Sequence, residues 1–405
     1  MVSMDVRPRL YDAVIAEHLA VHRQMLFITG PRQVGKTTTC RRHADGYLNW
    51  DNFDEREIIL AGPSRLAEWL GLDSLADSLP VVLFDELHKF PRWKQLLKGF
   101  FDTYSERVKV MVTGSSHFDL YRSGGDSLMG RYFVYRMHPF SVAEVIDPSP
   151  PPANEVVRPP APIDDDEFEA LWRYGGYPEP FLKRSDRFSR RWQALRFDAL
   201  VRQDVRDISR VQHLGQLQTM ARLLAAESPL RVVFDRLARR LRVSIDTVRN
   251  WLDLLCRLHL GFLLRPWYKN VARSLRKEPR WLLRDWSALE DPGQRAETFV
   301  GCHLLKAVEG WTDLGLGRFE LCYLRDKDKR EVDFVVIRDG EPWFLVEVKL
   351  RGGRPSPSLE HFQGALGAPF AFLVEVEGRH VDADCFARPG GPLIVPARTF
   401  LSQLL

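Results

Sequence analysis

The first part of the chain alternates short apolar runs with stretches in which apolar residues recur at helical spacing. The apolar runs predict five strands, over residues 25–29, 47–50, 81–84, 109–113 and 131–137. Alternation of this kind is typical of a parallel sheet flanked by helices, because a strand buried on both faces is apolar throughout. We therefore expect an α/β domain over residues 1–146.

The pattern changes twice along the rest of the chain. Residues 147–163 hold seven prolines, a density that sustains neither a helix nor a paired strand, so we predict a linker or an extended surface loop. From residue 164 to 268 the apolar spacing is mostly helical and predicts an all-α domain. Strand-like runs return after residue 269, which predicts a C-terminal α/β domain over residues 269–405.

The composition fits a folded, soluble protein of two or three domains. The chain has 405 residues, of which 45% are hydrophobic and 28% charged. We expect no membrane segment and no signal peptide, because the longest apolar runs are short and the first ten residues lack an apolar core. Five scattered cysteines without a CxxC pair indicate reduced thiols in a cytoplasmic protein. The net charge of +4 does not by itself establish nucleic-acid binding.

Residues 30–37 spell GPRQVGKT, which fits the phosphate-loop pattern G-x-x-x-x-G-K-[ST] between a predicted strand and a helix-compatible segment. The glycines let backbone amides turn onto phosphates at the positive end of the following helix. Lys36 is suited to neutralise the β and γ phosphates, and the Thr37 hydroxyl to ligate Mg²⁺. We expect the ATP-binding residues to be Gly30, Pro31, Arg32, Gln33, Val34, Gly35, Lys36, Thr37 and Thr38.

Two acids follow the apolar run VVLF, so they should lie at the carboxyl end of a buried parallel strand, where open α/β sheets bind ligands. Asp85 is the candidate for holding the magnesium ion. Glu86 is suited to orient or deprotonate the attacking water. Together with the phosphate loop, this pair predicts a nucleotide hydrolase.

Further polar residues follow the next two predicted strands. The run 109–113 leads into Gly114, Ser115 and Ser116, which makes Ser115 the candidate for sensing the γ-phosphate, with Thr113 close behind. Arg131 begins the fifth predicted strand and is a candidate for stabilising transition-state charge in a neighbouring subunit. On spacing alone, an ordinary surface arginine is an equal alternative.

The order GPRQVGKT, NWD, VVLFDE, VTGSS, GR and YGGYPEP resembles the prokaryotic AAA-superfamily ATPases that carry a C-terminal domain of unknown function, over nearly the whole chain. The resemblance implies a five-stranded parallel sheet with an extra strand between the phosphate-loop strand and the acidic strand. It also implies a sensor role for Ser115, an arginine-finger role for Arg131 and a possible homo-oligomer. YGGYPEP is most simply a rigid turn, with Gly175, Gly176 and Pro178 fixing the backbone.

Residues 231–265 look like a winged helix-turn-helix, with an apolar helix, a short turn and a second helix capped by Ser244. Residues 228–265 hold eight arginines against three aspartates, a local charge of +5. One interpretation places Thr247, Arg249 and Asn250 on a DNA recognition helix. It places Arg239, Arg240 and Arg242 near phosphates. The alternative is a packing module of the ATPase whose arginines are solvated.

Acidic residues and a lysine recur in the C-terminal part. Glu297 lies in a helix-compatible run, Asp333 in REVDFVVI, and Glu347 with Lys349 in FLVEVKL. Glu347 and Lys349 should share one face of their strand. A turn at residues 338–340 makes a hairpin that brings Asp333 beside them.

This order, Glu then Asp then Glu-x-Lys, resembles the restriction-endonuclease-like superfamily, and Gln363 matches the glutamine often found after the catalytic strand. The resemblance implies that Asp333 and Glu347 bind Mg²⁺ and that Lys349 positions or activates water for phosphodiester cleavage. The alternative is an ordinary arrangement of cross-strand charges in a fold without activity.

Two hypotheses about function follow. The first is a Mg²⁺- and ATP-dependent AAA ATPase that acts on DNA through the winged helix and the nuclease-like domain. The second is a nucleotide switch whose C-terminal domain is a catalytically inactive protein- or DNA-binding module. They differ in what Asp333, Glu347 and Lys349 do.

Overall fold

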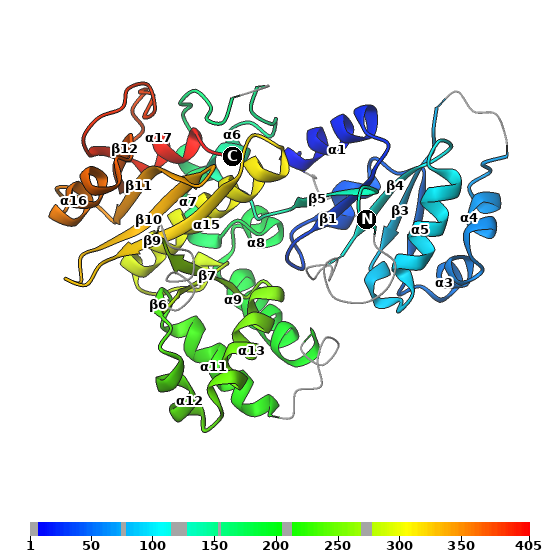
Figure 1. Cartoon of the computed structure of the whole chain (residues 1–405), viewed down its shortest axis with the longest axis horizontal. Helices are drawn as coiled ribbons and strands as arrows, with labels where there is room; N and C mark the ends of the chain where they lie inside the picture. Colours follow the sequence, from blue (N-terminus) through cyan, green and yellow to red (C-terminus); the bar gives the residue numbers. More distant parts are fainter. Residues whose placement is uncertain (1–6, 74–77, 115–127, 153–154, 205–212, 269–277) are drawn as a thin grey trace. The chain divides into compact units, whose positions relative to one another are not determined.

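The computed structural model describes residues 7–73, 78–114, 128–152, 155–204, 213–268 and 278–405 (Figure 1). The chain forms two compact units, and each is described here by itself. Unit 1 comprises residues 1–138 with 148–150, and unit 2 comprises residues 139–147 with 151–405. The predicted domain boundaries stay predictions.

Unit 1 contains one parallel sheet of five strands in the order β2-β3-β4-β1-β5. All five predicted strands are present and their ends agree within one residue: β1 (Met25–Thr29), β2 (Gly46–Asn49), β3 (Val81–Asp85), β4 (Lys109–Thr113) and β5 (Tyr132–Arg136). Because β4 lies between β1 and β3, the extra strand implied by the resemblance is confirmed.

Helices cover this sheet and connect its strands: α1 (Leu10–Val21), α2 (Lys36–Arg41), α3 (Phe53–Leu60), α4 (Pro63–Trp69), the 3₁₀ turn η1 (Leu87–Lys89) and α5 (Trp93–Tyr104). The core between the sheet and α3, α4 and α5 includes Phe27, Phe84, Leu97 and Phe100, each fully buried. Burial of these side chains fixes the sheet, and thereby the positions of the loops at its carboxyl edge.

Unit 2 contains an eight-stranded mixed sheet in the order β13-β12-β11-β10-β9-β7-β8-β6. The C-terminal strands match the runs predicted for an α/β region, whereas β13 was not predicted. The strands are β6 (Leu230–Arg231), β7 (Gly261–Pro266), β8 (Arg280–Leu283), β9 (Phe319–Arg325), β10 (Glu331–Arg338), β11 (Glu341–Lys349), β12 (Phe370–Glu375) and β13 (Leu393–Pro396).

The prediction of an all-α region over residues 164–268 is wrong, because β6 and β7 lie inside that range. Both pair with β8 in antiparallel fashion, and β7 also pairs with β9 in parallel. A two-residue strand leaves no periodic signal. The apolar run that forms β7 is too short to be separated from the end of a helix by periodicity.

The helices of unit 2 are α6 (Val142–Ile146), α7 (Asp165–Tyr174), α8 (Pro178–Lys183), α9 (Asp186–Ala199) with the π-helical turn η2 (Leu200–Asp204), α11 (Leu214–Ala226), α12 (Phe234–Leu241), α13 (Ile245–Arg257), the 3₁₀ turn η3 (Trp286–Ala288), α15 (Pro292–Asp313), α16 (Pro357–Leu366) and α17 (Ala397–Ser402). Among the described residues, none of the helices combines the length and apolarity that crossing a bilayer requires.

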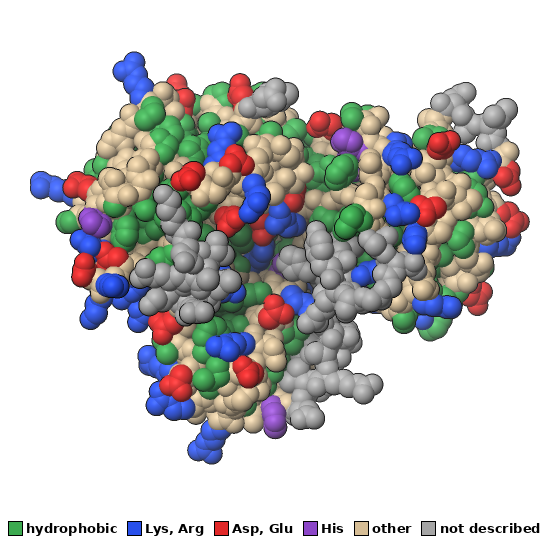
Figure 2. Space-filling view, viewed as in Figure 1, with side chains coloured by type: hydrophobic (Ala, Val, Ile, Leu, Met, Phe, Trp, Pro, Cys, Tyr) green, Lys and Arg blue, Asp and Glu red, His purple; other side chains and the backbone are tan. Residues whose placement is uncertain are grey.

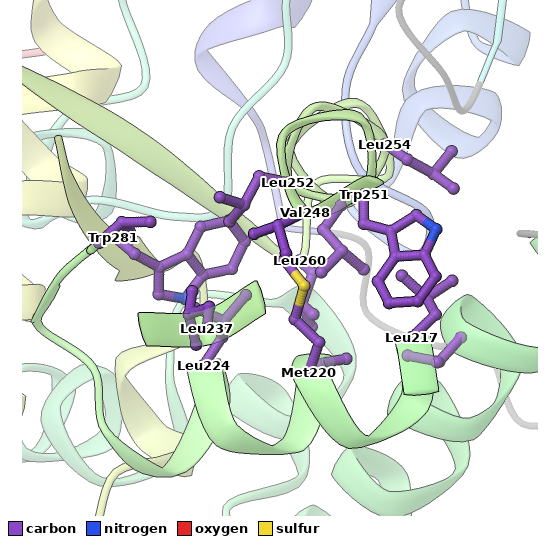
Figure 3. Packing of buried hydrophobic residues seen from close by; sticks show 14 of the residues in the cluster. Leu217, Met220, Leu224, Leu237, Val248, Trp251, Leu252, Leu254, Leu260 and Trp281 are labelled. Carbon is purple, nitrogen blue, oxygen red and sulfur yellow. The ribbon is translucent and has the colours of Figure 1, made fainter. Parts of the chain in front are cut away.

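A separate apolar core joins α11, α12 and α13 to strand β8 (Figure 3). On α13 the buried residues Val248, Trp251, Leu252 and Leu255 follow helical spacing. Trp281 of β8 is fully buried in the same cluster. This core leaves the opposite side of α13 to solvent.

Part of the proline-rich segment is anchored rather than free. The backbone N–H of Arg158 donates to the carbonyl of Gln403 at 2.9 Å, and that of Ala161 donates to the Ser402 hydroxyl at 3.2 Å. Val156 and Ile163 are buried. These contacts hold the segment against the C-terminal helix α17 without regular secondary structure.

The YGGYPEP motif packs against the turn that contains η3. A Cβ atom on Gly176 would stand 2.4 Å from the Phe140 carbonyl oxygen and 2.9 Å from a ring carbon of Trp286. The N–H of Phe140 donates to the Gly176 carbonyl at 2.7 Å. The motif therefore has a structural explanation, because the backbone at Gly176 leaves no room for a side chain.

We predict that Gly176→Ala lowers the free energy of unfolding by about 1–3 kcal/mol, because its methyl group must displace the Phe140 backbone or the Trp286 ring. Chemical denaturation of the full-length chain, followed through the unfolding transition of unit 2, measures this effect. The matched control is Gly364→Ala on α16, where a Cβ meets no atom within 4 Å. That control should be neutral or slightly stabilising, and an equal loss in both variants would contradict the packing explanation.

Candidate functional site

The loop between β1 and α2 has a backbone that requires glycine at both ends of its motif. Gly30 and Gly35 have φ angles of 143° and 102°, in the region that favours glycine. A Cβ on Gly30 would stand 2.3 Å from the carbonyl oxygen of Met137, just after β5. The loop is therefore pressed against the end of the neighbouring strand, and Gly35 caps the start of α2.

Lys36 bends back onto this loop. Its Nζ donates to the carbonyls of Gly30 at 2.9 Å and Pro31 at 2.7 Å, and the residue is buried. Burial lowers the pKa of Lys36 from 10.5 to about 8, although the charges of Glu86 and Asp85 oppose the shift. Among the described residues, the buried ammonium group donates to neutral carbonyls. Anionic phosphate oxygens would accept stronger, charge-assisted hydrogen bonds from it.

Asp85 ends β3 and accepts hydrogen bonds from three hydroxyl groups. Thr37 and Tyr47 donate to its Oδ2 at 2.9 and 3.0 Å, and Thr113 donates to Oδ1 at 2.5 Å. Asp85 is buried at the carboxyl edge of the sheet. The Thr37 hydroxyl and the carboxylate are the oxygen donors that Mg²⁺ prefers, and the structure brings the two together.

The neighbouring acid, Glu86, is held by the turn η1. Its Oε2 lies 3.4 Å from Lys89 Nζ and 3.8 Å from His88 Nε2. Lys89 also contacts Asp51, after β2, at 2.5 Å. The φ of Glu86 is 55°, a left-handed conformation that is unfavourable for this residue type and is common at functional sites.

Five other predicted ATP-binding positions complete the loop. Gln33 has a φ of 63°, and Val34 is buried. Arg32 is half-buried, Pro31 is buried, and Thr38 is exposed on α2.

Arg9, the residue before α1, also contacts the loop. Its guanidinium donates to the carbonyl of Val34 at 2.6 Å and to that of His138 at 2.6 Å.

The predicted sensor and arginine finger have different outcomes. Ser115 lies outside the described residues, whereas Thr113, the second candidate, contacts Asp85 directly. Arg131 donates two hydrogen bonds to the carboxylate of Asp102 in its own chain, at 2.7 and 3.0 Å. The hydrogen bond from Arg131 lowers the pKa of Asp102. Whether Arg131 acts in a neighbouring subunit stays a prediction.

In unit 2, the predicted nuclease-like residues approach one another. Asp333 on β10 accepts a hydrogen bond at Oδ2 from the N–H of Val348, which lies between Glu347 and Lys349 on β11 (2.9 Å). Lys349 Nζ lies 3.2 Å from Glu347 Oε1, so these two residues share a face as predicted. The turn at Asp339 and Gly340 joins the two strands.

Arg280, at the start of β8, reaches into this group of acids. Its guanidinium forms an ion pair with Glu297 of α15 and lies 3.7 Å from Asp333 Oδ1 and 3.4 Å from Glu331 Oε1. Burial raises the pKa of Glu297 to about 8, and the charge of Asp333 adds to the shift while Arg280 opposes it. Burial also raises the pKa of Asp333.

The last member of the predicted set, Gln363, lies on α16 and turns toward the end of that helix. Its Nε2 donates to the carbonyls of Gly390 at 2.6 Å and Ala368 at 3.3 Å. Among the described residues, no three His, Cys, Asp or Glu side chains come together in a way that could hold a metal ion.

The predicted DNA contacts lie on exposed parts of α12 and α13. Arg242 ends α12 with a φ of 55° and is exposed, as are Arg249 and Asn250, whereas Thr247 is half-buried. Arg249 lies 3.3 Å from Asp246 Oδ1 and over the ring of Phe234. In Figure 2, Lys and Arg side chains around α12 alternate with acidic ones.

Three family models match the chain in succession. Residues 22–146 match a model described as AAA domain. We refer to residues 22–146 as the AAA domain, after this match. Residues 165–290 and 292–381 match two models described as domains of unknown function, DUF8612 and DUF4143.

Curated relatives extend over most of the chain. The uncharacterized proteins Rv2008c of Mycobacterium tuberculosis and Mb2031c of Mycobacterium bovis are each 25% identical over 363 residues, which cover 86% of this chain and 75% of theirs. Their descriptions assign no activity.

Two solved structures are more distant. AMPPCP-bound DnaA from Aquifex aeolicus is 13% identical with a TM-score of 0.31, over 60% of this chain and 86% of that chain. PCH-2 from C. elegans is 14% identical with a TM-score of 0.23, over 61% and 65%. At these TM-scores we draw no argument from either structure.

Sequence patterns did not identify four residues at these sites. Tyr47 and Lys89 of the AAA domain contact Asp85 and Glu86, and no motif marks either of them. Arg9 precedes the first helix in a segment without a recognisable pattern. Arg280 did carry a signal, because it is a charged residue at the head of the buried strand RWLL.

We predict that the affinity of the AAA domain for ATP falls above about pH 8, by about tenfold per pH unit. The charged form of Lys36 binds phosphate, and its pKa of about 8 means that binding must take up a proton above that pH. Below about pH 8 the amine already carries its charge, so the affinity should be level there. A titration of the dissociation constant measures the effect, and Lys36→Arg, whose guanidinium stays charged over this pH range, should remove the slope. A slope that persists in this variant would assign the titration to another group.

Proposed function

We propose that the AAA domain binds ATP with Mg²⁺ and hydrolyses it. The observation that carries this proposal is the convergence of three groups at the carboxyl edge of the sheet: the Lys36 amine, the Thr37 hydroxyl and the Asp85 carboxylate. Lys36 would neutralise phosphate charge, while Thr37 and Asp85 would hold the ion. Bound magnesium would supply charge stabilisation for the phosphate oxygens.

In this proposal Glu86 acts on the attacking water as general base or orienting group. Its ion pair with Lys89, which Asp51 holds from the other side, supports a positioning role for the lysine. The backbone of Glu86 is left-handed, whereas a residue that continues a regular strand has an extended backbone. The Glu86 side chain therefore leaves the chain in a different direction from that of a strand residue.

We predict that Glu86→Gln retains ATP binding and lowers turnover by about 10²–10⁴-fold, because the amide keeps the shape of the side chain but cannot accept a proton. Lys36→Ala should abolish binding itself. Steady-state hydrolysis and equilibrium nucleotide binding separate the two effects. Glu106→Gln, an exposed acid after α5, is the matched control and should leave both unchanged. Unaltered turnover in Glu86→Gln would refute the assignment.

We further propose that unit 2 directs the output of the ATPase to DNA. The element order α11-β6-α12-α13-β7-β8, with β8 paired to both β6 and β7, supports the winged-helix interpretation. On α13 the buried face packs against α11 and α12 (Figure 3). Arg249 and Asn250 of the same helix are exposed. This arrangement leaves the helix available for a groove of DNA.

The packing-module alternative rests on acidic partners near these arginines. Arg249 forms an ion pair with Asp246. Arg239 forms one with Asp235, and Arg240 forms one with Glu227. Exposed ion pairs of this kind contribute only about 0–1 kcal/mol, so a phosphate can compete for the arginine. We therefore prefer DNA binding.

We predict that the double variant Arg242→Ala/Arg249→Ala weakens duplex DNA binding and lowers the slope of log affinity against log salt by about 2, one for each lost phosphate contact. Fluorescence anisotropy over a salt series measures both quantities. Arg318→Ala is the matched control, because Arg318 is exposed and lies near its own acid, Glu320. The DNA assignment fails if the control loses as much affinity, or if the wild-type chain binds no duplex.

DNA cleavage by the C-terminal domain is a second candidate function. The proximity of Asp333 to Glu347 and Lys349 favours it. We place it second because Arg280 pairs with the acids that would have to bind magnesium. A catalytically inactive C-terminal domain accounts for the same residues.

A further inference from the structure

Arg280 belongs to a different part of unit 2 from the acids that it contacts. It heads β8, which pairs with β6 and β7 beside the helices α12 and α13. Its partners Glu297, Glu331 and Asp333 lie on α15 and β10. Arg280 therefore connects the strand next to the helix-turn-helix with the C-terminal part of the sheet.

The oxygen atoms that a metal would need are already engaged by protein groups. Asp333 Oδ1 faces Arg280, and Oδ2 accepts from the N–H of Val348. Glu347 Oε1 faces Lys349, and Oε2 accepts from the N–H of Ser356 at 3.0 Å. One oxygen of each predicted metal ligand thus accepts a backbone hydrogen bond, and the other faces a cation of the chain itself.

The charges around the acids are also nearly balanced. Four carboxylates meet three cations: Glu297, Glu331, Asp333 and Glu347 with Arg280, Arg325 and Lys349. A divalent cation brought into this group would meet the buried Arg280 guanidinium at close range, and like charges repel strongly where water is excluded.

We infer that Arg280 takes the place of a divalent cation in the carboxylate cluster, and that it closes the cluster to metal while tying β8 to α15 and β10. The residues as arranged therefore do not fit the magnesium site implied by the restriction-endonuclease-like resemblance. The cluster is an ion-pair joint between the helix-turn-helix part and the C-terminal part of unit 2.

Mn²⁺ alone is the probe for this inference, with bound metal followed by electron paramagnetic resonance. The full-length chain is used without nucleotide and with Asp85→Asn, so that the AAA domain contributes no metal site. This chain should bind no Mn²⁺ that depends on Asp333. Adding Arg280→Gln/Glu297→Gln should raise the affinity for Mn²⁺ at least about tenfold, because the repelling guanidinium is gone. Asp333→Asn should remove the gained binding.

The double substitution is chosen because Arg280→Gln alone would leave Glu297 buried without its cation. Arg325→Gln is the matched control, since Arg325 pairs with Glu331 only at the edge of the cluster, and it should create no metal site.

The inference is overturned if the Asp85→Asn chain binds Mn²⁺ and loses it on Asp333→Asn. It is also overturned if the Arg280→Gln/Glu297→Gln variant shows a cooperative thermal unfolding transition, and is therefore folded, but gains no Mn²⁺ binding. If that variant fails to fold, the comparison of the Asp85→Asn chain with and without Asp333→Asn decides the question alone. Because no nucleotide is present, neither result depends on ATP hydrolysis.

Discussion

Asp85 imposes the constraint on which the nucleotide site depends, because a carboxylate removed from water must find hydrogen-bond donors within the protein. It finds them on three different elements: Thr37 at the start of α2, Tyr47 on β2 and Thr113 at the end of β4. These bonds connect the phosphate loop with the strands on both sides of β3. The geometry of the loop is therefore coupled to the register of the sheet.

The same constraint at the C-terminal cluster is met in a different way. Asp333 and Glu297 are half-buried, and the cation that they share is the buried guanidinium of Arg280. An arginine can satisfy a buried carboxylate and cancel its charge at the same time, provided that its own donors are also met. The cost is that the acids become fixed to β8 and to each other.

The sequence predicted the parts of both sites that local patterns encode. Gly30, Lys36 and Thr37 follow from a motif, and Asp85 follows from its place after an apolar run. The five strands of the AAA domain followed from continuous apolar runs.

The rest depends on contacts between distant segments. The hydroxyl of Tyr47 reaches Asp85 because of the register between the parallel strands β2 and β3. In this register Tyr47 lies beside Leu83, and Asp85 lies two residues further along β3 on the same face of the sheet. Nothing near Tyr47 in the chain encodes that register. Arg280 lies near Asp333 because of three successive strand pairings: β8 with β7, β7 with β9, and β9 with β10, which contains Asp333.

The two clusters show why similar residue types need not have the same chemistry. Hydroxyl groups stabilise the Asp85 carboxylate through neutral dipoles, so its negative charge stays available to a divalent cation beside Thr37. Around Asp333 the negative charge is compensated by the Arg280 guanidinium, which lies 3.7 Å from Oδ1. A motif of acids and a lysine specifies where carboxylates converge. Whether they bind metal depends on the charge of the group that satisfies them, and in this chain that group comes from a strand outside the motif.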